Sequence, residues 1–141
     1  MNGEGIIIHT DGGARGNPGP AACAFVAEAD GKIIQKESKF LGITTNNFAE
    51  YQGVILAYKW LTSNKQDLVI NNLSFYLDSE LIVRQLNGAY KVKDKTLLGL
   101  FQQVGDLSKS VDVDIFYKHI PRTKNKIADF FVNEELDSRI K

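Results

Sequence analysis

Four acidic residues lie at positions in the sequence where a carboxylate could bind a metal ion or take part in catalysis: Asp11, Glu50, Asp78 and Asp129. Asp11 and Asp78 each follow a short apolar run, IIIHT and LSFYL, with the composition of a buried strand. Glu50 and Asp129 each stand near the start of a helical pattern. Four converging carboxylates would raise one another's pKa values unless divalent cations sat among them. Ligands that are all oxygen favour Mg²⁺ or Mn²⁺ over zinc, and two such ions about 4 Å apart can cleave a phosphodiester.

Each acid also has a simpler interpretation. Asp11 could stabilise the turn at GNPG, and Glu50 could complete a capping box with Asn47 as the N-cap. Asp78 could cap the helix that follows it, and Asp129 suits the positive end of a helix dipole. The choice therefore depends on whether the elements bring the four side chains together.

Apolar periodicity divides the chain into nine elements. Runs with strand composition occur at 6–11, 21–28, 32–40, 73–78 and 111–119, and helical patterns at 46–64, 79–88, 95–107 and 125–136. Asp30-Gly31 is a hairpin signal between the second and third strands, and Gly88 is suited to end the second helix. Tyr51, Val54, Ile55, Tyr58 and Leu61 share one face of the first helix. The order is βββ-α-β-αα-β-α.

This order predicts an α/β fold, with one mixed five-stranded sheet and helices on both faces. Three antiparallel strands come first, and the two later strands pair in parallel through right-handed crossovers. The first and fourth strands then become neighbours, which brings Asp11 close to Asp78 at the edge where ligands bind. Glu50 shares a helix face with Gly53, and Asp129 shares one with Val132, so both acids should point inward. Jointly, the four acids predict a metal site.

Composition is typical of a globular protein: 141 residues form one expected domain, 1–141, with 43% hydrophobic and 24% charged residues. No apolar stretch reaches about 18 residues, and the N-terminus does not resemble a signal peptide, so we expect a cytoplasmic protein without a membrane anchor. Cys23 is the one cysteine, which excludes an internal disulfide and a thiolate metal cluster. The net charge is zero, but 84–95 and 118–126 are locally basic.

Four segments resemble the successive signature segments of ribonuclease HI in its short prokaryotic form. They are TDGGARGNPGPAA, TTNNFAEYQGVILAY, YLDSELIVRQLNGAYKVK and HIPRTKNKIAD, and the resemblance runs from about 6 to 136. It implies a ribonuclease H-like fold and an endonuclease that cuts the RNA strand of RNA–DNA hybrids. The implied products are a 5′-phosphate and a 3′-hydroxyl. The implied cofactors are two Mg²⁺ ions, with Mn²⁺ as an alternative, held by the four acids as catalytic and metal-binding residues.

The resemblance also assigns further residues. A residue before the last helix assists catalysis in the family, and the sequence offers both His119 and Arg122 for this role. One departure from the family is a short link after Gly88 without the long basic insertion of some members. We therefore expect weak, salt-sensitive binding that depends on Arg84, Lys91, Lys93 and the 118–126 loop. The expected substrate contacts are Gly12, Gly13, Arg15, Asn17, Asn46, Asn47, Ser79, Glu80, Lys124 and Asn125.

Two other functions stay open at this point. A nuclease with the same fold could act on double-stranded RNA or another nucleic acid, and a non-catalytic module could bind nucleic acid without cutting it. Glu80 stands where several family members have glutamine, which could alter substrate contact. We expect a monomer, although an exposed Phe130 or Phe131 would suggest a partner surface.

Overall fold

The computed structural model describes residues 5–140. Its strands are β1 (Ile6–Ala14), β2 (Gly19–Ala29), β3 (Lys32–Thr44), β4 (Asn72–Leu77) and β5 (Asp114–His119). Its helices are α1 (Asn46–Asn64), α2 (Glu80–Leu86), α3 (Lys95–Val111), the 3₁₀ turn η1 (Arg122–Lys124) and α4 (Lys126–Arg139). The element order is therefore the one that the periodicity predicts, with η1 added.

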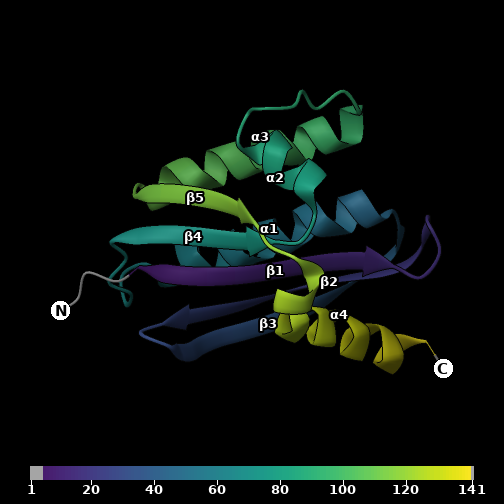
Figure 1. Ribbon diagram of the computed structural model, residues 1–141, viewed down its shortest axis with the longest axis horizontal. Helices are drawn as coiled ribbons and strands as arrows, with labels where there is room; N and C mark the ends of the chain where they lie inside the picture. Colours follow the sequence, from purple (N-terminus) through teal and green to yellow (C-terminus); the bar gives the residue numbers. More distant parts are fainter. Residues whose placement is uncertain (1–4, 141) are drawn as a thin grey trace.

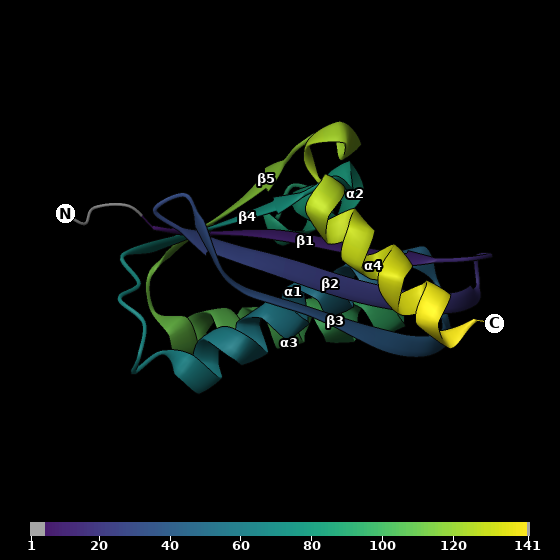
Figure 2. The same cartoon turned by 90° about the horizontal axis from the view of Figure 1, so that it is seen from below.

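The five strands form one mixed sheet in the order β3-β2-β1-β4-β5. β1, β2 and β3 pair antiparallel, whereas β4 runs parallel to β1 and β5 runs parallel to β4. α1 and α3 lie on one face of the sheet, and α4 crosses the opposite face (Figures 1 and 2). The predicted α/β class, the mixed sheet and the neighbouring first and fourth strands are confirmed.

The two faces of the sheet bury cores of different size. The larger core joins α1 and α3 to the sheet, and all five residues of the predicted apolar face of α1 are buried in it. The smaller core lies under α4, where Val132 and Leu136 pack on Ala22 and Ala24 of β2. Strand alternation explains the division, because successive side chains of β2 point to opposite faces. Phe130, by contrast, is 58% exposed on α4.

Several predicted boundaries are wrong by two to four residues. β1 runs on to Ala14 because it pairs with β2 as far as Ala14↔Ala21, although its ladder with β4 ends at His9↔Tyr76. Asp11 therefore lies inside a strand, beyond the parallel ladder, and not at the strand's end. α3 continues to Val111, where Asp112 takes a left-handed conformation (φ 55°) and ends the helix. The last strand consequently begins at 114.

The predicted hairpin turn is present between β2 and β3. Asp30 (φ 53°) and Gly31 (φ 77°) both have positive φ, which is the backbone that a two-residue Asp-Gly turn uses. On the question of membrane insertion, none of the helices within residues 5–140 combines the length and apolar composition needed to cross a bilayer.

Candidate active site

Three of the four acids meet beside the neighbouring interior strands β1 and β4. Ligand oxygens of Asp11, Glu50 and Asp78 all lie within 4.8 Å of one another. Asp11 comes from β1, Asp78 directly follows β4, and Glu50 comes from the beginning of α1. β1 and β4 are adjacent, so the parallel pairing predicted from the sequence is what brings the two aspartates together.

Glycines let α1 approach β1 closely enough for Glu50 to join the aspartates. A Cβ on Gly12 would lie 2.2 Å from the backbone of Ala49, and a Cβ on Gly53 would lie 2.9 Å from the carbonyl oxygen of Asp11. Real side chains do not tolerate such distances from backbone atoms. The helix and the strand can therefore touch only because both positions lack a side chain.

Asp129, the fourth acid, reaches the cluster from α4, on the opposite face of the sheet from α1. It lies in the first turn of α4 and lines the same cleft as the three clustered acids, and this cleft has a volume of about 520 Å³. Its carboxylate is near enough to Asp11 to raise the pKa of that residue. All four acids chosen from the sequence therefore line one cleft.

The cleft is unfavourable for ionised carboxylates. Burial, followed by the charge of Asp78, raises the pKa of Asp11 to about 8. Burial also raises the pKa of Glu50 well above its ordinary value, and the charges of Asp11 and Asp78 raise it further, while Arg122 opposes the shift. Without cations, the site would hold protons that a hard cation could replace.

The donor set fits a divalent cation such as Mg²⁺. Oε1 of Glu50 is buried without a hydrogen-bond partner among the described residues, and an orphaned buried oxygen of this kind calls for a ligand. Asp11 and Glu50 are each only 7% exposed, so their orientations are set by the protein. The clustered groups are all carboxylates, which excludes a preference for soft metals.

Asn125 is assigned a different role from the one expected. We expected a substrate contact, but the residue is 1% exposed and lies beneath the acids. Its Nδ2 donates to the carbonyl oxygen of Thr10 (2.8 Å) and to Oδ2 of Asp78 (2.9 Å). It therefore ties β1 to the Asp78 carboxylate and orients that carboxylate. Asn125 is a positioning residue, because burial leaves it no surface for a nucleic acid.

The β1–β2 loop is fastened to the start of α1 by two asparagines. Oδ1 of Asn46 accepts from the N–H of Ala14 (2.8 Å), and Oδ1 of Asn17 accepts from the N–H of Asn46 (3.0 Å). The alternative in which Asn47 is an N-cap is excluded, because Thr45 is the N-cap of α1 and accepts from the N–H of Phe48. Asn47 is thereby free of a capping role and lines the cleft.

Asp78 is likewise not a helix cap. Ser79 is the N-cap of α2 and accepts from the N–H of Ile82, which leaves the Asp78 carboxylate to the cleft. Glu80 lies one residue further on and pairs with Arg84 at 2.9 Å on the helix surface. Capping therefore explains neither Glu50 nor Asp78.

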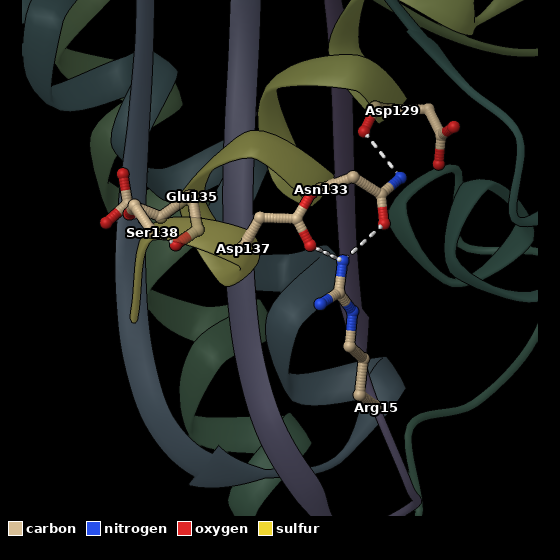
Figure 3. Close-up of polar contacts among 6 residues, drawn as sticks. All are labelled: Arg15, Asp129, Asn133, Glu135, Asp137 and Ser138. Carbon is tan, nitrogen blue, oxygen red and sulfur yellow. Dashed lines mark hydrogen bonds and ion pairs between the residues drawn. The ribbon is translucent and has the colours of Figure 1, made fainter. Parts of the chain in front are cut away.

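Arg15 lines the cleft and is held in place by residues of α4. Its Nη2 pairs with Oδ1 of Asp137 at 2.7 Å and donates to Oδ1 of Asn133 at 3.2 Å (Figure 3). Asn133 in turn donates to the carbonyl oxygen of Asp129. This chain of contacts links the end of β1 to the helix that carries Asp129. Asn133 was missed from the sequence, although its position four residues after Asp129 places it on the same helix face.

The remaining expected residues separate into two groups. Gly12, Gly13, Arg15, Asn46, Asn47, Ser79 and Arg122 line the cleft with the four acids. Lys124 instead lines a separate, smaller pocket, and His119 ends β5 with an exposed side chain. Of the two residues considered for a catalytic role, only Arg122 lines the cleft.

Comparisons with known proteins agree with this geometry. A family model described as reverse transcriptase-like matches residues 9–135. The bifunctional protein Rv2228c of Mycobacterium tuberculosis is 38% identical over 135 residues, which are 94% of this chain and 36% of that protein. The chain thus spans little more than a third of that relative. A ribonuclease H of Caldanaerobacter subterraneus subsp. tengcongensis is 31% identical, and the match covers 99% of this chain and 96% of that protein.

The solved structures include LC11-RNase H1, isolated from compost, in complex with an RNA/DNA hybrid. It superposes with a TM-score of 0.91 at 43% identity, and the match covers 96% of this chain and 99% of that chain. The close superposition and the sequence identity over nearly the whole chain lead to one conclusion. The protein belongs to the ribonuclease H family.

Proposed function

We propose that the protein is a metal-dependent endoribonuclease that hydrolyses the RNA strand of RNA–DNA hybrids. The observation that carries the proposal is the convergence of Asp11, Glu50 and Asp78, whose ligand oxygens lie within 4.8 Å of one another, with one buried carboxylate oxygen of Glu50 that has no hydrogen-bond partner within residues 5–140. Without a cation such a cluster retains protons at neutral pH, and a divalent cation could replace them. The hybrid in the related LC11 complex supports the choice of substrate.

Two Mg²⁺ ions would be held by the four acids, with Mn²⁺ as a substitute, and they would activate a water and stabilise the leaving 3′ oxygen. The chain's own residues do the rest. Asn125 fixes the orientation of Asp78, and the buried position of Asp11 holds its carboxylate still. Arg122 lines the cleft and supplies positive charge next to the phosphate, but arginine is not a proton donor at neutral pH. The products would carry 5′-phosphate and 3′-hydroxyl ends.

Recognition of RNA would use the rim formed by the β1–β2 loop and the start of α1. The side-chain oxygens of Asn46 and Asn17 each accept a hydrogen bond from a backbone N–H group. In each residue the side-chain NH₂ therefore points away from that hydrogen bond. Such amides can donate to a ribose 2′-hydroxyl or a base edge, and the 2′-hydroxyl distinguishes RNA from DNA. Gly13 offers the nucleic acid an open backbone, since an added Cβ there would meet only Asn46 Oδ1 at 3.9 Å.

A cleavage assay tests the proposal. Labelled RNA–DNA hybrid, RNA duplex and DNA duplex are incubated with Mg²⁺, Mn²⁺ or EDTA, beside the Asp11→Asn variant. Metal-dependent cleavage of the hybrid, lost in the variant, supports the proposed activity. Equal cleavage of the RNA duplex would shift the assignment to a nuclease of broader substrate range. Binding in every metal without any cleavage would leave a non-catalytic module.

A further inference from the structure

A second pocket lies on the face of the sheet that α4 covers, and it shares no lining residue with the cleft. Its volume is about 140 Å³, and it is lined by His9, Val26, Glu28, Ile33, Thr123, Lys124, Lys126 and Ile127. Its walls are mainly apolar, while its rim carries two lysines. This combination suits a planar ring attached to a phosphate.

The pocket continues the line of the catalytic cleft. Strand alternation places His9 on the same face as Asp11, two residues away and about 7 Å along β1. The 3₁₀ turn η1 separates the two hollows, since Arg122 lines the cleft and Lys124 lines the pocket. A nucleic-acid strand that runs from the acids across η1 would therefore reach the pocket next.

Aromatic rings extend this face beyond His9. The imidazole of His9 lies 5.2 Å from the ring of Tyr76 on the neighbouring strand. Nζ of Lys118 lies 5.8 Å from the Tyr76 ring and 5.7 Å from the ring of Phe116, which is 48% exposed. α4 packs on β1, β2 and β3 and leaves this part of the sheet uncovered (Figure 1). Together His9, Tyr76, Phe116 and Lys118 form an open strip, which we call the aromatic strip.

Exposed aromatic rings beside lysines are the groups with which proteins bind unpaired nucleic acid, because bases stack on the rings while the lysines contact phosphates. The positive charges of Lys118, Lys124 and Lys126 outnumber the negative charges of Glu28 and of Asp114, which strand alternation places on the same face of β5 as Phe116. The charge therefore complements a phosphodiester chain, and the surface adjoins the cleft in which that chain would be cut.

We propose that the pocket and the aromatic strip bind an unpaired extension of the RNA strand whose paired part lies in the cleft. The inference rests on the proposed function, because it needs an RNA strand at the acids. It goes further in naming a preferred substrate: hybrids in which the RNA strand continues beyond the duplex. A blunt hybrid uses the cleft alone, whereas an RNA overhang also occupies the second surface.

Binding of three hybrids to the Asp11→Asn protein in Mg²⁺, measured by fluorescence anisotropy, tests this inference. The hybrids are blunt, extended on the RNA strand, or extended by the same sequence on the DNA strand, each overhang being about six nucleotides, a length within the range of single-strand sites. We expect the RNA overhang to tighten binding by about tenfold, which is within the range for stacking of one or two bases. The DNA overhang should give no comparable gain.

Phe116→Ser and Ile127→Glu, both at exposed positions, should abolish the gain from the RNA overhang. Lys109→Glu is the matched control, because it reverses an exposed charge on α3 at the opposite face and should keep the gain. Unchanged affinity for the blunt hybrid in each variant verifies that the fold and the cleft are intact.

An overhang without effect, or a gain that survives in both Phe116→Ser (in the strip) and Ile127→Glu (in the pocket), would overturn the inference. The same holds for an equal gain from the DNA overhang. If the pocket and the aromatic strip bound a protein instead of RNA, the overhang would have no effect on affinity, and this result would overturn the inference. Failure of the proposed function is a separate outcome, since the wild-type protein would then not cleave the blunt hybrid in Mg²⁺ at all.

Discussion

Replacing Asp11 by asparagine removes a charge that the fold accommodates poorly without cations. The pKa of Asp11 rises from 3.8 to about 8, mainly through burial and then through the charge of Asp78. The unfolded chain releases this proton near the ordinary pKa. Between about pH 4 and pH 8 the folded state therefore binds more protons than the unfolded state, so the stability of the metal-free protein falls as pH rises through this window.

The size of the effect follows from the shift. One pKa unit corresponds to about 1.4 kcal/mol, so a shift of about four units costs at most about 6 kcal/mol above pH 8, and about 4 kcal/mol at pH 7. Asparagine keeps the shape of the side chain but accepts the Gly12 N–H bond more weakly than a carboxylate. We therefore expect Asp11→Asn to raise the free energy of unfolding by about 1–3 kcal/mol at pH 8 and to change it little at pH 4.

Urea unfolding in EDTA at about pH 4, 6 and 8, followed by circular dichroism, measures this difference. Asp106→Asn on the exposed side of α3 is the control and should leave the pH profile unchanged. Adding Mg²⁺ should restore the wild-type stability at pH 8 and should have less effect on the variant. A flat wild-type profile, or a variant that is less stable than wild type at pH 8, would refute the reasoning. Cleavage retained by the variant would refute the catalytic assignment of Asp11.

Three further tests, with five substitutions between them, address the parts of the site separately. Gly12→Ala should cost about 1–3 kcal/mol of stability and most of the activity, because its Cβ would collide with the backbone of α1, whereas Gly13→Ala should fold normally; urea unfolding and hybrid cleavage compare the two. Asn125→Ala should cost about 1–3 kcal/mol, because it leaves buried partners unpaired, and should weaken the apparent Mg²⁺ affinity in a metal titration of cleavage. Arg122→Ala should lower kcat by about 10²-fold, as for the loss of one group that stabilises transition-state charge, and His119→Ala should lower it much less; equal losses would contradict the distinction drawn from the cleft.

Local patterns in the sequence predict most of the elements. The apolar face of α1, the Asp-Gly hairpin and the alternation of helices with the last two strands are short-range features, and each is confirmed. The boundaries were less predictable. Val111 is apolar enough to begin a strand, but burial on α3 keeps it helical until Asp112 reverses the backbone. The end of β1 depends on its pairing with β2, which is a contact between distant residues.

The sequence by itself determined which residues could form the site: two acids follow apolar runs, two stand near the start of helices, and the order of the elements makes the first and fourth strands neighbours. Only the tertiary structure decided how the supporting residues act. Asn125 is buried and donates to Asp78, Arg15 is held by Asp137, and Thr45, not Asn47, is the N-cap of α1. These roles depend on side-chain directions and on distances between segments far apart in the chain. Residue type and spacing constrain the face that a side chain occupies, whereas its partners are set by how the elements pack.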